Sequence, residues 1–131
     1  MNFKEKIINE YPLNNKLNCE LDCYSLEKRR YLIFYDDIIQ KKDISQVLKK
    51  IQSKTCNSSF TEWKTLIVVG KTNDEFKKEE LFYFNNVNTF VVFLLIDESK
   101  NKIYKNNSWI FALGCNYKKY VNKINEILSK E

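Results

Sequence analysis

The segment TFVVFLLID, residues Thr89–Asp97, is the strongest structural signal in this chain and decides its fold class. It is apolar on both faces, which is typical of a strand in the middle of a sheet. A second apolar segment lies upstream and predicts another strand over Trp63–Val69, ended by Gly70. These two segments predict a protein built around a buried sheet.

Further strands and a helix are expected around this pair. Aromatic and β-branched residues in Arg30–Tyr35 predict a strand that runs into a turn at Asp36 and Asp37. Apolar residues at helical spacing predict an amphipathic helix over Ile44–Ile51, with Asp43 as its cap. The remaining expectations here are short strands at 81–84 and 102–104, a helical turn at 74–80, and a tight turn at Asn85 and Asn86.

Helices are also expected near both ends of the chain. Phe3, Ile7 and Ile8 have helical spacing, and the spacing of residues 17–24 predicts a second helix that puts Cys19 and Cys23 on one face. The sequence therefore predicts a single α+β domain over residues 1–131, with one mixed sheet of four to five strands flanked by helices. A C-terminal amphipathic helix, capped by Asn116, presents an apolar face formed by Tyr117, Tyr120, Val121, Ile124, Ile127 and Leu128.

Composition restricts the class of partner and the compartment. Hydrophobic residues make up 44% of the 131 residues, which is enough for a packed core, and the net charge is +5. The lysines are spread along the chain, so we expect a solvated basic surface and only a weak DNA contact within a larger complex. The longest apolar run, Phe90–Ile96, is far shorter than a membrane span, and no apolar signal segment is present. We therefore expect a cytoplasmic protein with free thiols and no membrane contact.

Several kinds of chemistry lack their usual residues. The chain contains no histidine, and its two glycines, Gly70 and Gly114, form no phosphate-binding loop. Cys19 and Cys23 are not at the spacing of a zinc knuckle, and Cys56 and Cys115 stand alone. We expect buried structural thiols and no cofactor or metal, with a zinc site built from all four cysteines as the alternative.

One acidic group of residues suggests an enzyme. Asp36 and Asp37 end one predicted strand, and Glu62 and Lys64 begin another, which is similar to the Asp and Glu-x-Lys arrangement of metal-dependent nucleases. There, carboxylates bind a hard cation and a lysine stabilises the attacked phosphate. Asp97 and Glu98 could complete such a site if their strand neighbours the first. Asp36 and Asp37 also suit a turn, and a Glu-x-Lys triplet is common in a chain with 30% charged residues. We therefore expect no catalytic residues, with the metal-dependent nuclease that uses Asp36, Asp37, Glu62 and Lys64 as the alternative.

Aromatic residues suggest a surface that binds a partner. Aromatics form 15% of the chain, and five of them lie near the ends of predicted segments. Exposed aromatic side chains act as anchors in protein interfaces, although some of these five could instead fill the core. The five candidate anchors are Trp63, Trp109, Phe111, Tyr117 and Tyr120.

The segment FTEWKTLIVVGKT, together with FVVFLLID, SWIF and NYKKYV further on, resembles the middle components of bacterial ABC-three-component conflict systems, of which Lamassu is the familiar type. The resemblance runs from about Phe60 to the C-terminal helix. It implies a non-catalytic adaptor that binds an SMC-like ABC ATPase, restrains an effector, commonly a nuclease, and couples it to DNA sensing. A toxin-neutralising immunity protein remains an alternative of the same size and composition.

Overall fold

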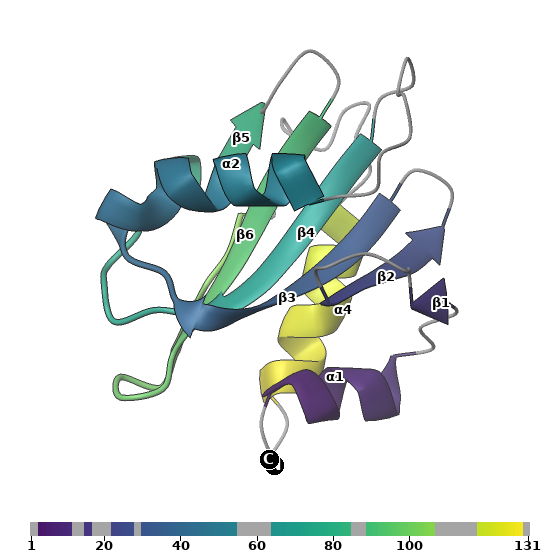
Figure 1. The fold of residues 1–131 in the computed structure, drawn as a ribbon. Coiled ribbons are helices and arrows are strands. Elements are labelled where there is room, and N and C mark those ends of the chain that lie inside the picture. Colours follow the sequence, from purple (N-terminus) through teal and green to yellow (C-terminus); the bar gives the residue numbers. More distant parts are fainter. Residues whose placement is uncertain are drawn as a thin grey trace.

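The computed structural model describes residues 3–11, 15–16, 22–27, 30–54, 64–84, 89–106 and 118–129, and it confirms the α+β class. Seven strands form one mixed sheet, which is more than the four to five predicted. Helices lie on both faces of this sheet (Figure 1). The strands are β1 (Asn15–Lys16), β2 (Asp22–Glu27), β3 (Arg30–Ile38), β4 (Lys64–Lys71), β5 (Phe82–Phe84), β6 (Thr89–Asp97) and β7 (Lys102–Tyr104).

Three parallel strands, β3, β4 and β6, form the centre of the sheet. Their register places Phe34, Val69 and Leu94 side by side. Parallel neighbours need a crossover connection, and the helix α2 (Ile44–Lys54) provides it between β3 and β4. β6 has the bounds that the sequence predicts and is buried along most of its length, as expected for an interior strand.

The outer edge of β6 pairs with two short antiparallel strands. β5 pairs with Phe90–Val92, and β7 pairs with Leu95–Asp97. At the other edge of the sheet, β2 runs antiparallel to β3, and β1 pairs with β2. The short strands predicted at 81–84 and 102–104 are thus confirmed, and both help to cover β6.

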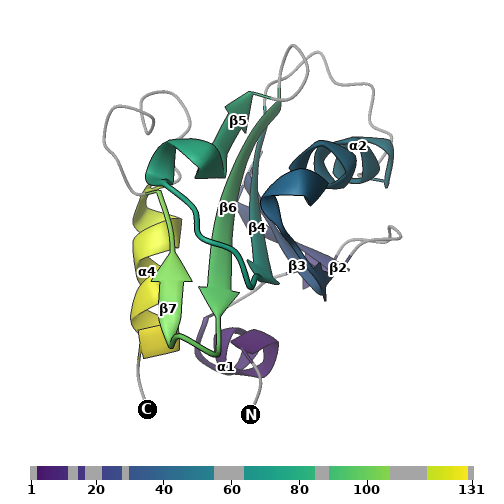
Figure 2. The same ribbon diagram turned by 90° about the vertical axis from the view of Figure 1, so that its left-hand side faces the viewer.

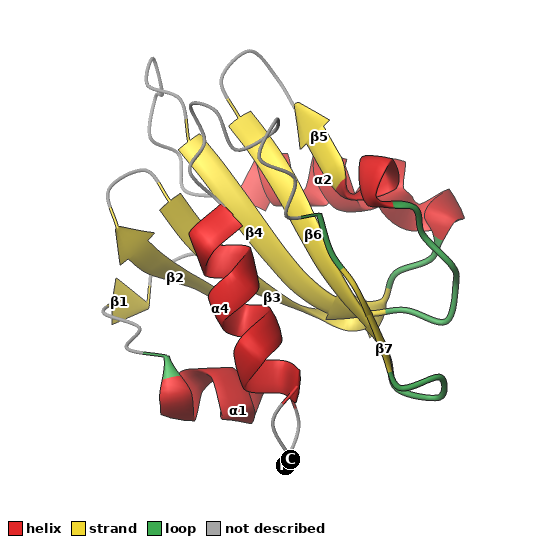
Figure 3. Cartoon of the chain, turned by 180° about the vertical axis from the view of Figure 1, so that it is seen from behind, coloured by secondary structure: helices red, strands yellow, loops and turns green. Residues whose placement is uncertain are grey.

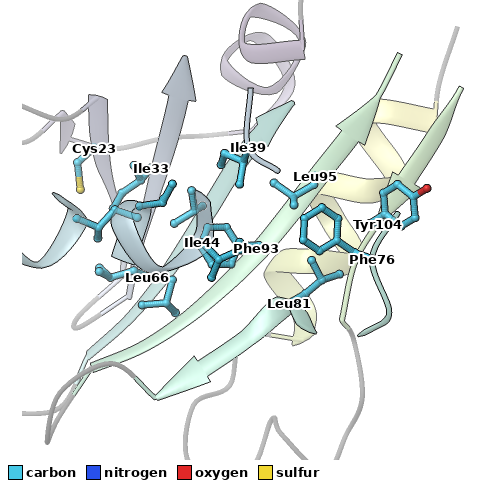
Figure 4. Close-up of a cluster of buried hydrophobic side chains, with 14 residues drawn as sticks. Cys23, Ile33, Ile39, Ile44, Leu66, Phe76, Leu81, Phe93, Leu95 and Tyr104 are labelled. Carbon is cyan, nitrogen blue, oxygen red and sulfur yellow. The ribbon is translucent and has the colours of Figure 1, made fainter. Parts of the chain in front are cut away.

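Strand alternation divides the core into two halves, one on each face of the sheet. On one face, Ile44 of α2 packs in a cluster with Phe93 of β6 (Figure 4). Val47 and Ile51 of α2 and Val68 of β4 belong to the same cluster. Figure 2 shows the sheet edge-on, with α2 on one side and the C-terminal helix on the other. The predicted helix at Ile44–Ile51 is confirmed, and its apolar stripe faces the sheet.

The opposite face is covered by α1 (Phe3–Glu10) and α4 (Lys118–Ser129); in Figure 3, α4 lies in front of the sheet, with α1 at its lower end. Ile7 of α1 and Ile124 of α4 are fully buried there. They pack in a cluster with the alternate residues of the central strands, such as Ile67 and Val92. Both terminal helices were predicted, and both are confirmed within these bounds.

The helix predicted over residues 17–24 is wrong where the structure describes it. Asp22–Glu27 forms strand β2, and Cys23 pairs with Ile33 of β3 at 1% exposure. The spacing of Leu17, Leu21 and Tyr24 suggests only a weak preference for helix. Pairing with the long strand β3 stabilises the extended conformation more strongly, because tertiary contacts override local propensity. Leu17, Cys19 and Leu21 lie outside the described residues, as do Asn85, Asn86 and Asn116.

Three further predictions, the turn at Asp36 and Asp37, the strand end at Gly70 and the helix cap at Asp43, are corrected. Asp36 and Asp37 remain in β3, which continues to Ile38, and Gly70 lies inside β4 rather than after it. Asp43 belongs to a 3-10 turn, η1 (Lys41–Asp43), where its Oδ2 accepts a hydrogen bond from the Gln40 amide at 3.0 Å. It therefore caps η1 and not α2. The helical turn predicted in 74–80 is confirmed as a second 3-10 turn, η2 (Lys78–Leu81), at the end of that segment.

Candidate functional site

The residues of the nuclease hypothesis lie at opposite ends of the sheet. Asp36 and Asp37 are exposed near the carboxyl end of β3, whereas Lys64 begins β4 and is 8% exposed. Ile38 pairs with Lys71 of β4, seven residues after Lys64. At about 3.3 Å per residue, roughly 20 Å separates Lys64 from the two aspartates. A lysine at that distance cannot stabilise a phosphate that is attacked at a cation held by Asp36 and Asp37, and Glu62 lies outside the described residues.

Asp97 and Glu98 do not complete a site with Asp36 and Asp37. They share the carboxyl edge of the sheet, but β4 lies between β3 and β6. Glu98 forms an ion pair with Lys71 at 3.2 Å. Within the described ranges, no group of three or more cysteine, aspartate or glutamate side chains is placed to hold a metal ion.

The carboxylate of Asp97 is committed to the turn that follows β6. Its Oδ1 accepts hydrogen bonds from the Ser99 hydroxyl at 2.7 Å and from the Lys100 amide at 3.2 Å. The hydroxyl of Ser99 is the main cause that holds the pKa of Asp97 below its usual value. Asp97 therefore stays ionised and serves as a turn-forming acceptor.

Other carboxylates fix the loops that follow β3 and β4. Asp74 accepts a hydrogen bond from the Lys41 amide at 3.0 Å, and Glu80 accepts one from the Lys77 amide at 2.8 Å. These amides are the leading causes that lower the pKa of Asp74 and of Glu80. Gln40 adds a direct link between the same two loops by donating to Asn73 at 2.8 Å. The polar residues at this edge thus hold two loops in one arrangement.

The proposed aromatic anchors fall mostly outside the described structure. Trp63, Trp109, Phe111 and Tyr117 lie beyond the described ranges. Tyr120 is described and is only 5% exposed, in the core beneath α4. For this residue, the alternative of filling the core holds.

A groove of about 470 Å³ lies between the carboxyl end of β3 and helix α2. Val47 of α2 is buried in it, and Ile38 of β3 stands 54% exposed at it. The sequence reasoning missed this feature, although the Ile38–Ile39 pair after two aspartates was a signal, because strand alternation forces one of two adjacent apolar residues outward. The groove is lined by Tyr35, Asp37, Ile38, Asp43, Gln46, Val47 and Lys50.

No protein-family model, no curated protein and no solved structure matches this chain. Among the described helices, none has the length and apolar character needed to cross a bilayer.

Proposed function

We propose that this chain is a non-catalytic adaptor subunit of an anti-phage or anti-plasmid defence complex. In this role it bridges an SMC-like ABC ATPase and an effector, restrains the effector, and couples its release to DNA sensing. The sequence resemblance supports the proposal through segments that form β4 and β6, two of the three parallel strands at the centre of the sheet. Basic residues of the chain can add a weak DNA contact that a partner initiates.

The observation that carries the proposal is that carboxylates near the carboxyl ends of the central strands form hydrogen bonds and ion pairs within the protein. A catalytic acid or base must reach its substrate with a proton or a lone pair. Asp74 and Asp97 instead accept backbone amides, and Glu98 pairs with Lys71. Beside them lies a groove with an exposed isoleucine. Rigid loops next to apolar surface suit a protein that binds another protein.

The adaptor hypothesis is tested by co-expressing the tagged chain with the products of its two flanking genes. The complex is washed at high salt, which screens exposed charge pairs but leaves apolar contacts intact, and is weighed by native mass spectrometry. We expect one particle that contains the ATPase and the effector. Recovery of the chain alone refutes the adaptor, and recovery with a single toxin supports an immunity protein instead.

The nuclease alternative needs a separate assay. Purified chain with Mg²⁺ or Mn²⁺ is incubated with DNA and with RNA, and we expect both to stay intact because the structure keeps Asp36 and Asp37 far from Lys64. Metal-dependent cleavage that is lost in Glu62→Ala and kept in the surface variant Ile8→Ser would contradict the proposal.

A further inference from the structure

We propose that the groove between β3 and α2 is a docking site for a partner segment that carries an apolar side chain next to a basic one. The inference rests on the proposed function, since it names the surface by which the adaptor holds a protein partner. It uses the exposed Ile38, the buried Val47 and the charged residues around them.

The groove offers apolar contact from two elements. Val47 of α2 is 4% exposed and belongs to the core on this face, and the partly buried Tyr35 of β3 packs against that core. Ile38 is one of two large hydrophobic side chains that are exposed in the described part of the chain. An aliphatic side chain placed against Ile38 and Val47 removes apolar surface of both proteins from water. This contact selects an occupant with a leucine-like side chain.

The charges around the groove select the second feature of the occupant. Asp37 and Asp43 line it, and among the described residues that line it Lys50 is the one cation. The ammonium of Lys50 lies 5.3 Å from the centre of the Tyr35 ring, a distance typical of a cation–π contact. This contact holds the positive charge beside Tyr35. Asp43 keeps its place through the hydrogen bond from the Gln40 amide. The lining therefore has two carboxylates against one ammonium.

This local acidity contrasts with the whole chain, whose net charge is +5. Complementary charge across an interface admits a basic partner and rejects an acidic one. Nucleic acid is disfavoured for the same reason, because carboxylates repel phosphates. A basic and apolar protein segment is the occupant that fits both features.

The test is a titration of the ¹⁵N-labelled full chain with two synthetic peptides, followed by NMR. One is acetyl-Leu-Arg-Leu-Lys-amide, and the other is the acidic match acetyl-Leu-Glu-Leu-Glu-amide. We expect the basic peptide to shift the amide signals of Tyr35, Ile38 and Gln46, and the acidic peptide to leave them in place. No shift at millimolar peptide, equal shifts with both peptides, or shifts confined to other elements would overturn the docking site.

Two matched pairs of variants separate local contact from long-range charge. Asp37→Lys should weaken binding of the basic peptide at least about fivefold, while Asp36→Lys, the same change one residue outside the groove lining, should stay within about twofold. Ile38→Ser should weaken binding, while Ile8→Ser on α1, the other exposed isoleucine, should not. Equal effects within either pair would overturn the proposal.

The same variants in the co-expression experiment distinguish the two proposals. If the defence complex forms at the wild-type level with both Ile38→Ser and Asp37→Lys, the docking site is refuted and the adaptor proposal is unaffected. If the peptide binds in the groove but no complex forms with the flanking gene products, the adaptor role fails and the binding preference of the groove stands.

Discussion

Gly70→Ala probes how tightly β3 and β4 pack beneath α2. Gly70 lies inside β4, and a Cβ built on it would lie 3.1 Å from Cδ1 of Ile39, a side chain with no solvent exposure. The best carbon–carbon separation is about 3.5–4.0 Å, so the added methyl group overlaps Ile39 by roughly half an ångström. Overpacking of this kind costs about 1–3 kcal/mol, and the reduced freedom of the unfolded chain offsets about 0.4–1 kcal/mol. We expect a net loss of about 1 kcal/mol in the free energy of unfolding.

The contact with Ile39 can be isolated by a double-mutant cycle. Ile39→Val deletes Cδ1 and should cost about 0.5–1.5 kcal/mol by itself. In that background the new methyl group meets only ordinary contacts with Tyr35 at 3.6 Å, so Gly70→Ala should become neutral or slightly stabilising. The coupling energy should then be about 1 kcal/mol, well above the deviation of about 0.3–0.5 kcal/mol expected for independent sites.

The assay is urea unfolding of the wild type, the two single variants and the double variant, with equal m-values as a control for two-state behaviour. If Gly70→Ala costs the same with Ile39 as with Ile39→Val, the Cδ1 contact does not limit this position. The reasoning from the packing of Gly70 would then be refuted.

Two further predictions concern the core and the carboxyl edge of the sheet. Phe93→Ala should lower the free energy of unfolding in urea by about 3–5 kcal/mol, because Phe93 is fully buried in the middle of β6. Ile38→Ala should change it by no more than about 0.5 kcal/mol, because Ile38 is exposed. Similar losses for the two variants would contradict the burial of Phe93 or the exposure of Ile38. The pKa of Asp97 is lowered in the folded chain, so the unfolded chain binds more protons as the pH falls, and the wild type loses stability below about pH 5. Asp97→Asn removes this carboxyl and should flatten the dependence of stability on pH in that range. Parallel curves of urea midpoint against pH for the wild type and Asp97→Asn would show that Asp97 contributes nothing to the acid sensitivity.

The positions of the candidate site depended on tertiary structure. The sequence grouped Asp36 and Asp37 with Glu62 and Lys64 because each pair stands at an end of a predicted strand. The distance between the two groups depends on which strand ends lie side by side. Because β3 and β4 are parallel, the end of β3 lies beside the end of β4, and Asp36 and Asp37 are far from Lys64 at the start of β4. The groove beside Ile38 likewise needs α2 to cross over β3, which no local pattern states.

The sequence by itself determined the elements whose signal is local. Thr89–Asp97 is a strand because its residues are β-formers that are apolar on both faces, and α2 and α4 are helices because their apolar residues recur at helical spacing. Only the tertiary structure decided that Asp22–Glu27 is a strand and that Gly70 continues one. In both places the stabilisation comes from pairing with another strand, β3 for Asp22–Glu27 and β6 for Gly70, and the periodicity and propensity of the local residues do not encode that pairing.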